Sequence, residues 1–128
     1  MSAERKTIDA DAAPDAVGPY SHAVAVDKLL FCSGQIPLDP GSGELVGDTA
    51  QEQATQCLRN LAAVCEAAGT SLDRAVRLTV FTTQMNRFQE INEAYAEFFG
   101  GNPPARAVVG VAALPKAATV EIDAVVAL

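Results

Sequence analysis

The hydrophobic pattern near the N-terminus is that of short strands. Residues 5–10, 22–26 and 29–33 are rich in β-branched and small apolar side chains, and Asp27-Lys28 forms a tight turn between the last two segments. We therefore predict three strands, the first of which lies at a sheet edge. The stretch 33–47 is rich in glycine and proline, which predicts a structured loop.

A helical period replaces this pattern after residue 48. Thr49 followed by Glu52 is a capping-box signature, and Gly69 supplies a stop at the C-terminal end. The apolar residues between them fall on one face at helical spacing: Ala54, Cys57, Leu58, Leu61, Val64, Cys65 and Ala68. The spacing predicts a helix that buries this face.

The second half of the chain contains three more strands and one more helix. The strands are predicted at 75–83, 106–112 and 118–128 from their β-branched and small apolar content. A second helix is expected before Gly100-Gly101, with Asn86 as its N-cap. Its apolar side consists of Phe88, Ile91, Tyr95, Phe98 and Phe99.

The predicted order, β-β-β-α-β-α-β-β, is typical of an α+β sandwich in which two helices cover one face of a sheet. Alternate residues of the last strand point to opposite sides, Val120, Ile122, Ala124 and Val126 to one and Glu121, Asp123, Val125 and Ala127 to the other. A half-apolar second face on so small a domain indicates self-association, although a curled sheet could hide the same residues.

Length, composition and charge narrow the possible functions. The 128 residues suit a single domain, 1–128, and an apolar fraction of 49% indicates a globular protein. A net charge of −7 disfavours nucleic acid as the main partner. No apolar run approaches the ~20 residues of a membrane helix. The stretch Met1–Ala10 lacks the features of a secretory signal, so we expect a cytoplasmic protein.

Metal and cofactor motifs are missing from the sequence. The cysteines, Cys32, Cys57 and Cys65, form no CxxC motif, and His22 is the only histidine, which is too few ligands for a zinc cage. We interpret the cysteines as reduced core thiols. The glycines form no phosphate-binding motif, and we expect neither a metal nor a cofactor.

A few residues could carry chemistry. Arg106 begins an otherwise apolar strand, and its planar fork suits a substrate carboxylate; the alternative is an arginine that faces solvent or pairs with a carboxylate such as Glu121. Glu121 and Asp123 share one strand face, where burial would raise a carboxyl pKa and permit acid–base work; the alternative is a solvated face. We interpret His22 as a hydrogen-bonding residue in a turn. Cys32 is interpreted as a small buried residue rather than a nucleophile.

Several fragments, in order along nearly the whole chain, resemble the RidA/YjgF family. They are Gly18-Pro19-Tyr20-Ser21, Ser33-Gly34-Gln35-Ile36-Pro37, Pro104-Ala105-Arg106, Leu114-Pro115-Lys116 and Val120-Glu121-Ile122. The resemblance implies a chorismate-mutase-like α+β fold. It also implies a homotrimer whose sheets form a central barrel-like core, with a cleft at each subunit interface.

The same resemblance implies hydrolysis of reactive 2-imino and enamine acids, such as 2-aminoacrylate and 2-iminobutyrate, to 2-keto acids and ammonia without a cofactor. In the deaminating branch, the residue matching Arg106 binds the substrate carboxylate, and the residue matching Glu121 positions or activates water. The remaining matches to the cleft are Tyr20, Ser33, Gly34 and Asn92.

The chain departs from the family pattern at Ala107, Val108, Gly110 and Ala113. Val108 stands where many members carry a cysteine, so thiol chemistry there is not expected. Two alternatives stay open: a non-catalytic trimer that binds small carboxylates or regulates a partner, and a deaminase for a different acid.

Overall fold

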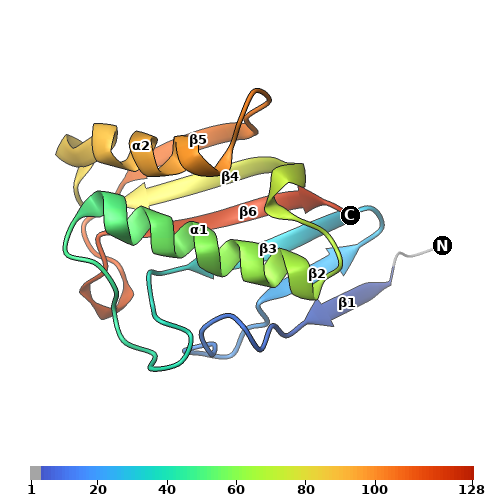
Figure 1. The fold of residues 1–128 in the computed structure, drawn as a ribbon. Coiled ribbons are helices and arrows are strands. Elements are labelled where there is room, and N and C mark those ends of the chain that lie inside the picture. Colours follow the sequence, from blue (N-terminus) through green and yellow to red (C-terminus); the bar gives the residue numbers. More distant parts are fainter. Residues whose placement is uncertain (1–3) are drawn as a thin grey trace.

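The computed structural model describes residues 4–128, which form one six-stranded sheet with two helices on one face (Figure 1). The elements are β1 Arg5–Ile8, β2 Ala23–Val26, β3 Leu29–Gln35, α1 Ala50–Ala67, β4 Ala75–Thr82, α2 Phe88–Phe98, β5 Ala105–Gly110 and β6 Val120–Ala127. The predicted element order and the α+β class are confirmed. The first three residues of Met1–Ala10, where no signal sequence is expected, lie outside the described residues.

The sheet is mixed, with the strand order β1-β2-β3-β6-β4-β5. Neighbouring strands run antiparallel except β4 and β5, which are parallel because α2 connects them as a crossover. The C-terminal strand β6 therefore lies inside the sheet between β3 and β4. Its Val120, Ile122 and Val126 side chains are fully buried under the helices, which sets the inner face of the whole sheet.

Helix α1 begins and ends as its sequence predicts. The Thr49 hydroxyl accepts a hydrogen bond of 3.1 Å from the Glu52 backbone N–H. After the last turn, Gly69 adopts a φ of +83°, the left-handed conformation that a glycine C′ residue allows. No helix within residues 4–128 is long and apolar enough to span a membrane.

The prediction that Asn86 caps the second helix is wrong. Asn86 lies inside a short 3₁₀ turn, Met85–Arg87, which leads directly into α2. Because Arg87 N–H already bonds to Gln84 O at 2.8 Å, the chain is turning before Asn86 could act as a cap. Arg87 occupies the N-cap position instead and forms an ion pair of 3.3 Å with Glu90.

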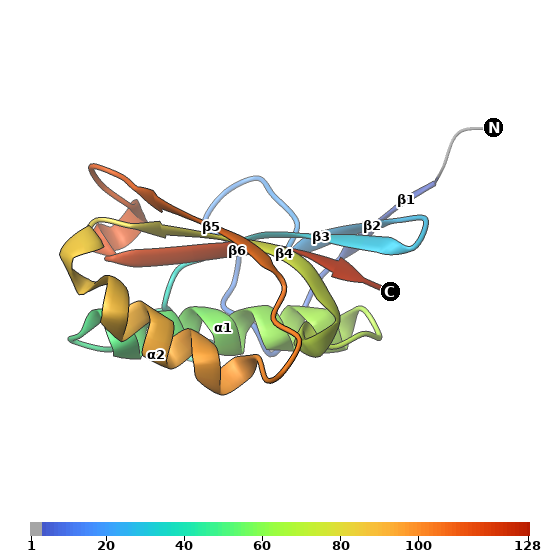
Figure 2. The same cartoon turned by 90° about the horizontal axis from the view of Figure 1, so that it is seen from above.

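The second face of the sheet is not covered by a helix (Figure 2). Its exposed side chains include Phe31, 45% of which is accessible, with Leu29 beside it on β3 and Val109 on β5. The alternating burial of β6 confirms that Glu121 and Asp123 point to this open face. An apolar patch next to two carboxylates is thus a feature of the isolated chain.

Strand β3 contains a bulge at the open face. Cys32 pairs with Ala124 and Gln35 pairs with Ile122, so Ser33 and Gly34 together oppose the single residue Asp123. A bulge inserts one residue and changes the direction of the side chains that follow it. This one returns Gln35 to the interior and leaves Ser33 and Gly34 beside each other at one pocket.

Candidate active site

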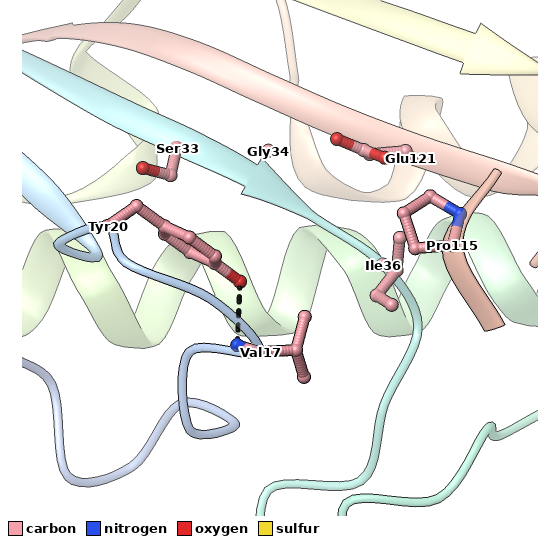
Figure 3. Close-up of a pocket in the computed structure, with 7 residues that line it drawn as sticks. All are labelled: Val17, Tyr20, Ser33, Gly34, Ile36, Pro115 and Glu121. Carbon is pink, nitrogen blue, oxygen red and sulfur yellow. Dashed lines mark hydrogen bonds between the residues drawn. The ribbon is translucent and has the colours of Figure 1, made fainter.

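A cavity of about 300 Å³ opens beside the β3 bulge (Figure 3). Its walls come from the loop before β2, the end of β3, the start of β6 and a short turn at 115–117. The lining residues are Val17, Tyr20, Ser33, Gly34, Ile36, Pro115 and Glu121. The fold thus brings together four residues predicted for the site from distant parts of the sequence, Tyr20, Ser33, Gly34 and Glu121.

Glu121 is the only acidic side chain among the lining residues. Partial burial, and then the neighbouring Asp123 carboxylate, raise the pKa of Glu121 above its ordinary value. A carboxyl group with a raised pKa can take a proton from water and return it more readily than an ordinary one. The geometry and the electrostatics therefore suit a general acid–base group.

Tyr20 and Ser33 place two hydroxyl groups in the same cavity. The Tyr20 hydroxyl accepts a 3.2 Å hydrogen bond from the Val17 backbone N–H, which leaves its own proton free to donate. The Ser33 hydroxyl donates to the Ser21 carbonyl at 2.7 Å and so has lone pairs free to accept. Together they provide one donor and one acceptor within the cavity that contains Glu121.

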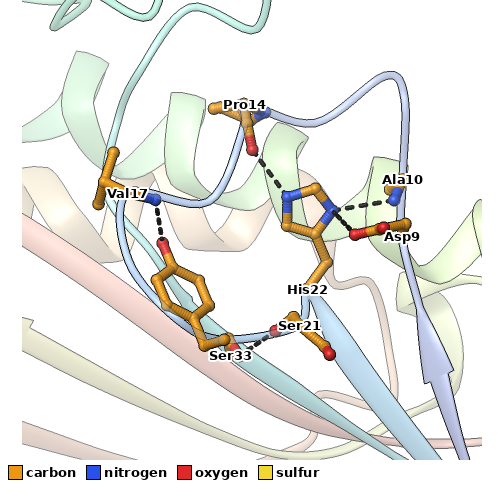
Figure 4. Close-up of polar contacts among 8 residues, drawn as sticks. Asp9, Ala10, Pro14, Val17, Ser21, His22 and Ser33 are labelled. Atoms are coloured by element: carbon orange, nitrogen blue, oxygen red, sulfur yellow. Dashed lines mark hydrogen bonds and ion pairs between the residues drawn. The ribbon is translucent and has the colours of Figure 1, made fainter.

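The loop that contains Tyr20 is anchored by His22 (Figure 4). Only 4% of His22 is exposed, its Nδ1 accepts from the Ala10 N–H at 2.9 Å, and its Nε2 donates to the Pro14 carbonyl at 2.8 Å. Both ring nitrogens therefore bind the main chain, and the ring is the neutral Nε2–H tautomer. This confirms the interpretation of His22 as a hydrogen-bonding residue.

Three amide side chains on α1 support the cavity and were missed in the sequence. Asn60 donates to the Leu38 carbonyl at 3.0 Å, and Gln56 donates to Asn60 Oδ1 at 2.9 Å. Gln53 accepts from both the backbone N–H and the hydroxyl of Thr119 at 2.8 Å, just before β6. The available signal was a polar residue at 53, 56 and 60, among the buried apolar positions of an amphipathic helix.

Arg106 and Asn92 lie together, but away from this cavity. The Arg106 guanidinium donates a 2.8 Å hydrogen bond to Asn92 Oδ1 and lies over the ring of Tyr95, 4.8 Å from its centroid. Within residues 4–128, no carboxylate lies at ion-pairing distance from Arg106. The guanidinium is exposed at the edge of the sheet with hydrogen-bonding capacity left over.

The sheet itself separates Arg106 from Glu121. Arg106 pairs with Leu78, whose side chain is fully buried under the helices, so Arg106 also points to the helix side. Glu121 points to the open face. The predicted set of site residues is therefore divided between two places on one chain, and the suggested Arg106–Glu121 ion pair does not form.

The other candidates do not contribute to the cavity. Cys32 is buried on the helix side, where a hydrogen bond with Cys65 and then burial raise the pKa of its thiol, which disfavours the nucleophilic thiolate. Lys116 is exposed and donates to the Gly43 carbonyl at 3.3 Å. In the part of the chain that is described, no three His, Cys, Asp or Glu side chains cluster as metal ligands would.

Comparison with known proteins finds one matching family model and several similar proteins. The family model for endoribonuclease L-PSP matches residues 10–128. The RutC family protein y4sK of Sinorhizobium fredii is 52% identical over 121 residues, covering 94% of this chain and 96% of that protein. The 2-iminobutanoate/2-iminopropanoate deaminase of Mus musculus is 47% identical, covering 94% and 90%.

Solved structures agree with the sequence matches. The crystal structure of E. coli TdcF with bound serine has a TM-score of 0.91 and 40% identity, covering 96% of this chain and 98% of that chain. Its ligand is a small amino acid, a molecule with a carboxylate beside a nitrogen-bearing carbon.

Proposed function

Because this chain belongs to the endoribonuclease L-PSP family, also called RidA/YjgF, we propose that it hydrolyses 2-imino acids and their enamine tautomers to 2-keto acids and ammonia. The observation that carries the proposal is the Glu121 carboxyl, with its raised pKa, in one cavity with the Tyr20 and Ser33 hydroxyls. The name of the mouse relative and the amino acid bound to TdcF support the same substrate class.

The reaction needs little beyond placement and proton transfer, because an imine carbon is already electrophilic. Glu121 takes a proton from water as the water oxygen bonds to C2 of the protonated imine, which gives a carbinolamine. The Glu121 carboxylic acid then protonates the amine nitrogen. The C–N bond breaks and ammonia leaves, while the Glu121 carboxylate takes the proton of the carbinolamine hydroxyl as the C2 carbonyl forms. Ammonia takes that proton from Glu121 and departs as ammonium, which restores the carboxylate. The hydroxyl of Tyr20 donates a hydrogen bond to the substrate, and that of Ser33 accepts one.

The substrate carboxylate is held by Arg106 of a second copy. In one chain Arg106 and Glu121 are on opposite sides of the sheet, whereas a copy packed against the open face can bring its own edge strand to the cavity. The exposed Phe31 and Leu29 side chains supply an apolar surface for this packing. We infer a homotrimer, as in the family, with one such cavity at each interface.

Part of the cavity wall is apolar, which suits a substrate with a short hydrocarbon side chain. Val17, Ile36 and Pro115 provide this wall, and the cavity volume of about 300 Å³ is at the small end for ligand sites. Imines derived from small amino acids fit both features.

Ribonuclease activity, which the family name suggests, has less support. Cleavage of RNA needs several cationic contacts to phosphate, but within one described chain no Lys, Arg or His lines the cavity, the proposed assembly adds only Arg106 of the second copy, and the chain has a net charge of −7. The only histidine has both ring nitrogens bonded to the main chain. The cavity therefore favours a small, singly charged acid over a polyanion.

The test is an imine-hydrolysis assay on matched variants. A generator enzyme supplies 2-aminoacrylate or 2-iminobutyrate, and keto-acid release is measured with wild type and with Arg106→Ala. We expect wild type to accelerate release and Arg106→Ala to lower kcat/KM by about 100-fold or more, because a charge-assisted hydrogen-bonded pair with the carboxylate is lost. Arg59→Ala, which removes an exposed arginine of α1, is the control and should keep full activity.

Two results would contradict the proposal. If folded wild type leaves the rate of keto-acid release unchanged while keto acids raise its melting temperature, the protein binds carboxylates without turning them over. Equal activity of Arg106→Ala and wild type would remove Arg106 from the site.

A further inference from the structure

Gly34 lies directly against the Glu121 side chain. A Cβ atom built on Gly34 would lie 3.0 Å from Glu121 Cδ and 3.3 Å from Glu121 Cγ, and closer still to Oε2. Real Cβ atoms are rarely this close to carbon atoms that are not bonded to them. The Glu121 carboxyl thus occupies the space that any other residue at position 34 would fill.

Backbone conformation does not explain this glycine. The glycines with positive φ in the described chain are Gly43, Gly47 and Gly69, so Gly34 has a φ that any residue can adopt. The β3 bulge turns position 34 toward β6, in which Glu121 is the second residue. Glycine is required here for space alone, which is one of the known uses of glycine in strands.

We infer that Gly34 is a positioning residue for Glu121, because its missing side chain lets the carboxyl lie across the β3 bulge and face Tyr20 and Ser33. This inference rests on the function proposed above, in which Glu121 transfers the protons. Gly34 would act through Glu121, in addition to any contact between its backbone and the substrate.

A side chain at position 34 should displace the Glu121 carboxyl without disturbing the fold. The atoms that a Cβ would meet are the far end of a flexible side chain, so Glu121 can rotate away without a change in the backbone. Gly34→Ala should therefore fold normally but hold the carboxyl outside the cavity. Once it is better solvated, the carboxyl should also have a lower pKa.

The first experiment measures imine hydrolysis and stability of Gly34→Ala. We expect kcat to fall by about tenfold or more, as for a misplaced general base, while KM changes by less than about threefold. The melting temperature should stay within about 2 °C of wild type. Gly100→Ala is the matched control, because its Cβ would have nothing within 4 Å, and it should behave as wild type.

The second experiment measures the pKa of Glu121 directly, by NMR titration of ¹³C-labelled carboxyl groups, with Glu121→Gln used to assign the signal. The pKa should be lower in Gly34→Ala than in wild type and unchanged in Gly100→Ala. Because this readout needs no turnover, it decides the positioning role even if wild type proves inactive on imines. Inactivity would contradict only the proposed function.

The inference is overturned if Glu121 titrates identically in wild type and Gly34→Ala. It is equally overturned if Gly34→Ala keeps full kcat, or if its loss appears entirely in KM, which would indicate a substrate contact made by the backbone. A large fall in melting temperature would mean that Gly34 is needed for folding instead.

Discussion

At the scale of single residues, Glu121 combines two properties that oppose each other. Its carboxyl is placed where ionisation is disfavoured, by partial burial and by the Asp123 carboxylate. The same placement makes it a better proton carrier near neutral pH. Glu121 thus favours the proposed reaction but lowers the free energy of unfolding when it is ionised.

The pH dependence of stability follows from this placement. The folded state raises the pKa of Glu121, so it binds the proton more tightly than the unfolded chain does. Stability is therefore lost as pH rises from the unfolded pKa through the folded pKa, and the loss persists above it. Glu121→Gln cannot ionise and so removes this loss, which should raise the melting temperature at pH 7.5. We expect a rise of only about 1–3 °C, because solvent partly screens a half-exposed group.

Calorimetry at pH 7.5 and at pH 4 checks this prediction. The difference between Glu121→Gln and wild type should shrink at pH 4, where the wild-type carboxyl is protonated. Glu66→Gln, which changes an exposed residue of α1, is the control. A Glu121→Gln protein that is less stable than wild type at pH 7.5 would show that the ionised carboxyl stabilises the fold.

At the scale of elements, α1 has two functions. Its apolar face packs on the sheet, and three amides beside that face bond to the main chain near residue 38 and to Thr119. Asn60 is 1% exposed, and its amide donates to the carbonyls of Ile36 and Leu38. Helix α1 thus holds the main chain at Ile36, a residue that lines the cavity, in place.

Asn60→Leu tests this arrangement. The substitution keeps the side-chain size but removes the Asn60 hydrogen bonds to both carbonyls and the Asn60 Oδ1 acceptor of the buried Gln56 amide, so we expect a loss of about 1–3 kcal/mol in the free energy of unfolding. Urea denaturation at one protein concentration measures it, with Arg59→Ala as the control on the same helix. An unchanged midpoint would mean that water replaces the amide. Loosening of Ile36 should also raise KM for imines more than it lowers kcat.

The elements themselves were largely predictable from local patterns. Thr49, Glu52 and Gly69 mark the ends of α1 because caps depend on residues within one turn of the helix. The prediction of Asn86 as the N-cap of α2 failed because Asn86 lies in a 3₁₀ turn and the N-cap is Arg87. Such turns at helix ends leave no clear signal in the sequence.

At the scale of the whole molecule, the open face of the sheet decides whether the site is complete. One chain places Glu121 on that face and Arg106 on the helix side. Assembly through the open face is the arrangement that we propose to unite them.

Mixed assemblies test this arrangement. Arg106→Ala and Glu121→Gln, each of which we expect to have little activity alone, are unfolded together in equal amounts and refolded. If each site takes its arginine and its glutamate from different copies, random mixing should restore about a quarter of the wild-type sites. Keto-acid release measures the recovery, and the two variants refolded separately and then combined are the control.

No recovery from mixed assemblies of confirmed trimeric mass would mean that both residues of a site belong to the same copy. Sedimentation of the refolded mixture supplies that mass. A purely monomeric wild type would contradict the assembly itself.

The sequence by itself determined the elements, their order and the sidedness of β6, because these depend on periodicity and on turn and cap residues close together in the chain. It also pointed to Tyr20, Ser33, Gly34, Arg106 and Glu121, through the resemblance of short fragments to a family.

Only the tertiary structure decided how these residues are grouped. The register of β3 on β6 put a bulge beside Glu121, and the register of β5 on β4 put Arg106 on the opposite side of the sheet. Strand register is set by packing between segments far apart in the chain, so a local pattern cannot specify it. The same packing brought the Asn60 amide to the carbonyls of Ile36 and Leu38, in the loop that borders the cavity.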